Sequence, residues 1–155
     1  MLWNRTSDLS TSAGRYALVV FEHRGATWPL RMLRPGFRHC FCLVQDGAIW
    51  SLCDPLKTRI VLRSVPELTE LDLLEVFEEQ GAIVLRGLVA SGECGRRAML
   101  RPMTCVEVVK RILNLDLPSV FTPHQLYLRL LRLPAPFQRF ESITASEIAL
   151  DVIHE

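Results

Sequence analysis

The sequence predicts an α+β domain in which an antiparallel sheet packs against helices on one side or at one end. Short apolar runs rich in β-branched and aromatic residues recur over residues 15–63 and again over residues 82–101. An Asp-Gly pair separates two of these runs, as in a tight hairpin. Two later segments begin with a threonine followed three residues on by Glu or Gln, which is typical of helix starts. Strands followed by helices favour the α+β class.

The length and composition are those of one folded domain. The chain has 155 residues, of which 49% are hydrophobic and 23% are charged, and this balance excludes an extended disordered chain. We expect a loose lead-in at residues 1–14, a single α+β domain at residues 15–133 and a C-terminal tail at residues 134–155.

Charge and hydropathy exclude several classes of partner. The formal net charge of +1 provides no field that would draw the whole molecule to nucleic acid. No apolar run reaches the roughly 18 residues that a membrane-spanning helix needs, and residues 1–14 lack the apolar core of a signal peptide. We therefore expect a cytoplasmic protein with no nucleic-acid partner and no membrane association.

Cysteine usage indicates reduced thiols. An odd number of cysteines in a chain without an export signal favours free thiols over a disulfide framework. Cys40 and Cys42 form a Cys-x-Cys pair, and Cys53 is the single further cysteine near them. This spacing is not that of common zinc sites, so packing in the core is the simpler explanation for the three residues. We expect no metal and no cofactor. The five are Cys40, Cys42, Cys53, Cys94 and Cys105.

Strands are predicted over residues 15–22, 59–63 and 82–89, with a short one at residues 98–101. Residues 23–37 contain two prolines and two glycines, so this segment is mostly loop, with a short extended piece around residues 30–33.

The clearest structural pattern in the first half of the chain is a β-hairpin over residues 38–55. If Asp46 and Gly47 form a two-residue type I′ turn, His39 lies directly opposite Asp54. Because side chains alternate along a strand, these two residues share one face of the hairpin, and three cysteines share the other. The first face holds His39, Phe41, Leu43, Trp50, Leu52 and Asp54; the second holds Cys40, Cys42 and Cys53.

Three helices are predicted. The first covers residues 66–80, with Pro66 at its first position and Gly81 ending it. The second covers residues 104–115, and a third covers residues 123–133.

The second helix has the strongest chemical signal. Thr104 as N-cap and Glu107 three residues later form a predicted capping box, which places Cys105 at the first helical position. The free N–H groups and dipole of a helix N-terminus favour negative charge, so they lower the pKa of a thiol there. A cysteine nucleophile also needs an imidazole held by a third polar group, and His39 with Asp54 supply that pair.

The motifs FRHCFCLV around His39, LCDP around Asp54 and PMTCVEVVKRIL around Cys105 resemble the circularly permuted papain-like superfamily. That group includes permuted relatives of the NlpC-type cell-wall peptidases and the lecithin retinol acyltransferase family. Ordinary papain-like enzymes have the cysteine first, whereas here the histidine precedes it. The resemblance implies a permuted papain-like fold in which Cys105 is the nucleophile, His39 the base and Asp54 the orienting residue. It also implies a thiol peptidase, amidase or acyltransferase acting on a peptide, cell-wall or acyl substrate.

Alternatives from another class remain open. Cys105 can be a buried small hydrophobe, and the pairing of His39 with Asp54 can simply be a cross-strand contact. The phrases TCVEVVKRIL and TPHQLY also resemble small phage or prophage proteins. On that interpretation the chain is a non-catalytic structural or virion assembly protein, located in the host cytosol or the virion, whose partners are other phage structural proteins.

Overall fold

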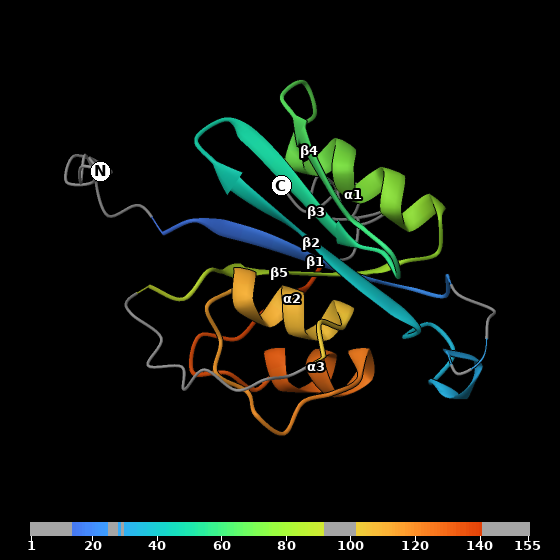
Figure 1. Ribbon diagram of the computed structural model, residues 1–155. Coiled ribbons are helices and arrows are strands. Elements are labelled where there is room, and N and C mark those ends of the chain that lie inside the picture. The colour runs from blue at the N-terminus through green and yellow to red at the C-terminus, as the bar shows by residue number, and fades with distance from the viewer. Residues whose placement is uncertain (1–13, 25–27, 29, 92–101, 141–155) are drawn as a thin grey trace, which may run out of the picture.

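The computed structural model describes residues 14–24, 28, 30–91 and 102–140. Over these residues the chain forms a six-stranded antiparallel sheet and three α-helices, which is the α+β class expected (Figure 1). The strand order is β4-β3-β2-β1-β5-β6. The strands are β1 Tyr16–Glu22, β2 His39–Asp46, β3 Ile49–Pro55, β4 Ile60–Val65, β5 Ile83–Leu88 and β6 Gln138–Arg139.

Helices cover both faces of the sheet, whereas the sequence pattern suggested one side or end. In Figure 1, α1 lies on one face, and α2 with α3 lies on the other. The reason is that β1, β2 and β5 are apolar on both faces. Along β1, Val19 packs in the cluster formed with α2 and α3, and Leu18 and Val20 pack in the cluster formed with α1.

Helix α1 (Glu70–Glu79) begins four residues later than predicted, so the assignment of Pro66 as its first residue is wrong. The N-cap is Thr69, whose hydroxyl accepts from the Asp72 N–H at 3.2 Å while the Asp72 carboxylate accepts from the Thr69 N–H at 2.7 Å. This reciprocal capping box is a stronger start signal than a proline. Gly81, at φ +71°, follows the C-cap as predicted.

Helix α2 (Cys105–Ile112) begins where predicted. Thr104 is its N-cap and accepts from the Glu107 N–H at 3.2 Å, which confirms Cys105 as the first helical residue. The predicted capping box is only half formed, because the Glu107 carboxylate pairs with Lys110 and Arg111, at 2.9 and 3.0 Å, and not with the Thr104 N–H. The helix ends at 112 because Asn114 adopts a left-handed conformation, with φ 56°.

Helix α3 (Pro123–Leu130) has the full capping box expected of its sequence. The N-cap Thr122 hydroxyl accepts from the Gln125 N–H, and the Gln125 side chain accepts from the Thr122 N–H. Pro123 occupies the first turn. The helix stops three residues before the predicted end at residue 133.

The hairpin is present, but its predicted register is wrong by two residues. The turn residues are Gly47 and Ala48, since Asp46 pairs with Ile49. Gly47 has φ +60°, and among the described non-glycine residues only Asn114 has positive φ. This is the pattern of a type II′ turn, which needs glycine only at its first central position, so Asp-Gly does not occupy both turn positions here.

An extended piece was predicted around residues 30–33, and a short strand at residues 98–101. Residues 30–32 form a single 3₁₀ turn in place of an extended piece. The strand predicted at residues 98–101 lies outside the described residues, as does Cys94.

The described part of the tail packs onto the sheet. Strand β6 pairs with β5, and Phe137 is almost fully buried, with 2% exposure. Gly87 on β5 allows this, because a Cβ at that position would run into the Phe137 ring. The folded core therefore extends to residue 140.

Candidate active site

His39 and Asp54 meet at one end of the sheet. His39 is the first residue of β2, and its Nε2 lies 2.7 Å from the Asp54 Oδ1 near the end of β3. Both side chains are mostly buried, at 13% exposure each. The observed register makes them diagonal neighbours, because the pairing continues from Cys42 opposite Cys53. A two-residue shift preserves the faces of the strands, so the predicted contact survives the wrong register.

Cys105 approaches the same place from the N-terminus of α2, which packs on β2. A hydrogen bond from the Cys40 thiol lowers the pKa of Cys105. Burial acts in the opposite direction, but hydrogen bonds from the His39 ring and the Cys40 backbone, together with the charge of His39, bring this pKa to about 4. The helix N-terminus favours the same ionised state. The sulfur is therefore a thiolate at neutral pH.

The His39 ring is protonated as the thiolate's partner. Burial opposes the charged ring, but hydrogen bonds to Cys105 and Asp54, with the charges of both, raise the pKa of His39 to about 9. Since Nε2 faces Asp54, Nδ1 is the ring nitrogen left for the sulfur. Thiolate and imidazolium thus coexist between about pH 4 and pH 9.

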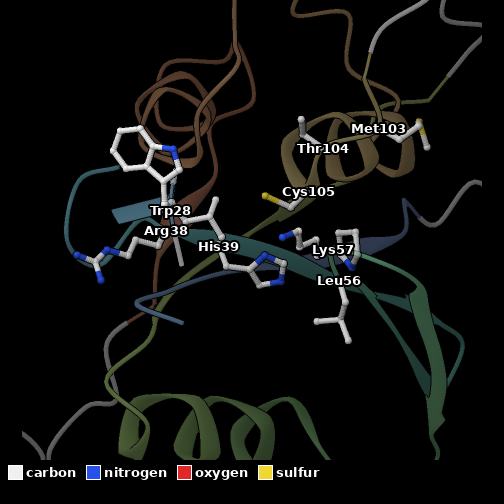
Figure 2. A pocket seen from close by; sticks show the side chains of 10 residues that line it. Trp28, Arg38, His39, Leu56, Lys57, Met103, Thr104 and Cys105 are labelled. Atoms are coloured by element: carbon white, nitrogen blue, oxygen red, sulfur yellow. The ribbon is translucent and has the colours of Figure 1, made fainter. Parts of the chain in front are cut away.

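A cavity of about 290 Å³ opens beside this pair. Figure 2 shows Cys105 and Thr104 at the start of α2 above the strand that carries His39, with Trp28 and Arg38 to one side and Leu56 and Lys57 to the other. The wall is mainly apolar and includes two cations. Its residues are Trp28, Leu30, Arg38, His39, Pro55, Leu56, Lys57, Met103, Thr104 and Cys105.

Backbone donors lie next to the sulfur. The first N–H groups of a helix have no acceptor within the helix, and Thr104 caps only that of Glu107. The N–H groups of Cys105 and Val106 therefore have no acceptor within α2 and lie at the positive end of the helix dipole. They are suited to stabilise an oxyanion that forms on a carbonyl attacked by the sulfur.

Two neighbours of the site were missed by the sequence analysis. Cys40 was placed only as a core cysteine, although it hydrogen-bonds to the Cys105 sulfur. Glu22 on β1 pairs across the sheet with His39, and its carboxylate lies 3.0 Å from Arg24. Burial raises the pKa of Glu22, with Arg24 and His39 opposing it. A signal existed for Glu22, since it ends a buried strand that must pair with the hairpin.

The other described cysteines do not share this environment. Cys42 and Cys53 are direct cross-strand partners, and burial raises the pKa of both thiols. Over the described ranges, no group of three or more His, Cys, Asp or Glu residues is arranged to hold a metal ion. None of the helices in the same ranges is long and apolar enough to cross a membrane.

Comparisons of the chain with protein-family models, with curated proteins and with solved structures found no match.

Proposed function

We propose that the protein is a papain-like cysteine hydrolase that acts on an amide or acyl bond through a thioester at Cys105. One observation carries the proposal: a thiolate at a helix N-terminus shares hydrogen bonds with an imidazolium that a carboxylate holds, beside an apolar cavity. The order of His39 before Cys105, on a strand and a helix that pack together, supports the permuted papain-like arrangement.

The chemistry follows from the protonation states. The Cys105 thiolate attacks the substrate carbonyl, and the N–H groups at the start of α2 stabilise the oxyanion. The His39 imidazolium then gives its Nδ1 proton to the leaving amine or alcohol as the carbon–heteroatom bond breaks, which leaves a thioester. Neutral His39 next takes a proton from water, whose oxygen attacks the thioester. The carboxylic acid departs, and Cys105 and His39 return to their charged forms.

Asp54 is a positioning residue in this scheme. Its carboxylate accepts from Nε2 and so fixes the plane of the ring with Nδ1 toward the sulfur. It also stabilises the imidazolium during each half of the reaction.

The cavity indicates what fits beside the sulfur. A volume of about 290 Å³ has room for one apolar side chain or a short acyl chain. Arg38 and Lys57 on its wall favour a substrate that also carries a negative group near the reacting carbonyl.

The test is to trap the thioester. The purified chain would be mixed with p-nitrophenyl esters of short acyl chains, with and without a terminal carboxylate, and analysed by intact-mass and peptide mass spectrometry. We expect an acyl adduct on Cys105 that hydroxylamine removes, and a burst of nitrophenol equal to the enzyme concentration.

Variants separate catalysis from incidental acylation. Cys105→Ala should abolish the adduct and His39→Ala should slow its formation at least tenfold, whereas Cys53→Ala, at another half-buried thiol, should change neither. Equal, slow acylation of all the cysteines in the folded wild-type chain would refute the proposal and favour the structural or virion assembly protein.

A further inference from the structure

A second thiol lies against the sulfur of the candidate nucleophile. Cys40 is the second residue of β2, fully buried, and belongs to the same core cluster against which Cys105 packs. Its thiol and its backbone N–H both hydrogen-bond to the Cys105 sulfur. The chemistry proposed for hydrolysis uses Cys40 only as a hydrogen-bond donor, so a buried nucleophilic group remains unexplained.

We infer that Cys40 and Cys105 form a reversible redox pair, in which a hydroperoxide oxidises Cys105 and Cys40 then closes a disulfide with it. The Cys40 thiol hydrogen-bonds to the Cys105 sulfur, and α2 packs directly on β2, so the two sulfurs are neighbours before any oxidation. This inference depends on the ionised sulfur, and it holds whether or not the chain is a hydrolase.

The two steps balance. The Cys105 thiolate attacks one peroxide oxygen, the O–O bond breaks, and the other oxygen leaves as water or alcohol with the proton of the His39 imidazolium. Cys105 is then a sulfenic acid, oxidised by two electrons. The Cys40 sulfur attacks the Cys105 sulfur, the S–O bond breaks, and the hydroxyl leaves as water with the Cys40 proton. A dithiol reductant restores both thiols by exchange.

The environment assigns each cysteine its step. Cys105 lines the cavity and is ionised, so it is the thiol that a peroxide reaches and oxidises. Cys40 has no exposed surface, and burial raises its pKa further than the contact with Cys105 does, so it stays a protonated thiol until the sulfenic acid forms. Oxidation therefore begins at Cys105.

The other cysteines are less well placed. Cys42 lies one full strand repeat beyond Cys40, roughly 7 Å along β2, and is paired with Cys53. Cys42 is also buried on the same face as Cys40, which makes it the matched control.

The experiment measures the covalent state of each sulfur. Reduced wild-type chain would be treated with one equivalent of hydrogen peroxide, blocked with iodoacetamide and digested for peptide mass spectrometry. We expect a Cys40–Cys105 disulfide that dithiothreitol reverses. Cys42→Ser should form the same disulfide. Cys40→Ser keeps a hydrogen-bond donor but has no sulfur, so it should accumulate sulfenic acid at Cys105, trapped by dimedone. A second equivalent of hydrogen peroxide should then oxidise this sulfenic acid to irreversible sulfinic acid.

Two results would overturn the inference. One is wild-type Cys105 passing to sulfinic acid as fast as in Cys40→Ser, and the other is a disulfide from Cys105 to a different cysteine. Far-ultraviolet circular dichroism checks that each variant is folded. Failure here leaves the proposed hydrolase intact, because the acyl adduct on Cys105 is a separate readout; a chain that forms the disulfide but no acyl adduct refutes only the hydrolase.

Discussion

The pH dependence of sulfur reactivity at Cys105 gives the sharpest test of the ion pair. A thiolate reacts and a thiol does not, so the rate of modification follows the ionised fraction. With a pKa of about 4, Cys105 is fully ionised at every pH above about 6. An ordinary thiol with pKa near 8.5 is about 0.3% ionised at pH 6 and half ionised at pH 8.5. Its rate should therefore rise about 150-fold over that interval.

A comparison at a single pH would mislead. Nucleophilicity falls with pKa, with a slope of about 0.4 to 0.5 in the logarithm of the rate, so a thiolate lowered by about 4.5 units reacts about 100-fold more slowly. At pH 6 the roughly 300-fold gain in ionised fraction leaves Cys105 only a few times faster than an ordinary thiol. At pH 8.5 it is slower. The diagnostic quantity is the flat profile.

The assay is modification by a neutral thiolsulfonate between pH 3 and pH 9, with each cysteine followed by peptide mass spectrometry. We expect a pH-independent rate for Cys105 from about pH 5 to pH 8.5 and a rising rate for Cys53, whose pKa burial raises. The urea-unfolded chain provides the ordinary thiol. A wild-type Cys105 profile that rises in parallel with the unfolded chain would refute the ion pair.

Variants separate the contributions to the low pKa. The hydrogen bond from Cys40 is its largest cause, ahead of the His39 ring. His39→Ala should therefore move the inflection upward from about 4 without reaching the ordinary value, and Cys40→Ala should also raise it. Cys40→Ser retains a donor and should stay closer to wild type. An unchanged inflection in both alanine variants would show that helix α2 alone ionises the sulfur.

Three further predictions address neighbouring parts of the structure. Asp54→Asn keeps an acceptor but removes a negative charge, so the pKa of His39 should fall from about 9, seen by NMR titration of its ring; an unchanged titration would contradict this. Gly87→Ala should destabilise the fold by about 1–3 kcal/mol in urea unfolding because its methyl group meets Phe137, and Phe137→Leu should reduce that penalty. Lys110→Met should lower the free energy of unfolding by about 3 kcal/mol in the same assay, because Lys110 is only 3% exposed and its amine donates to two backbone carbonyls and pairs with a carboxylate. A change under about 0.5 kcal/mol would contradict this prediction.

Local signals predicted the elements that carry the site. The position of Cys105 follows from its N-cap, because Thr104 and the residue three places later act within one helical turn. The shared face of His39 and Asp54 follows from strand alternation, which a two-residue error in register leaves unchanged. A register error of one residue would have placed the two side chains on opposite faces. The contact was predicted correctly because side chains on one face of a strand recur every two residues.

Long-range packing could not be predicted in the same way. Which helix covers which face of the sheet depends on apolar surfaces that the sequence shows for both faces of β1 and β2. The proximity of Cys40 to Cys105 is a consequence of that choice, since Cys40 is on the face that α2 covers.

The same choice explains why the site lies at the end of the sheet. Cys40 points into the core beneath α2, whereas His39 is on the same face of β2 as Phe41, which packs in the cluster on the α1 side. A histidine in the middle of β2 would therefore be separated from the α2 cysteine by the sheet itself. His39 is the first residue of its strand and Cys105 the first of its helix. The ring and the sulfur therefore meet at the end of the sheet, where the sheet does not separate them. Moving Cys105 one turn further into α2, or His39 two residues further into β2, should therefore abolish the ion pair. The two residues form one site because each is the first residue of its element.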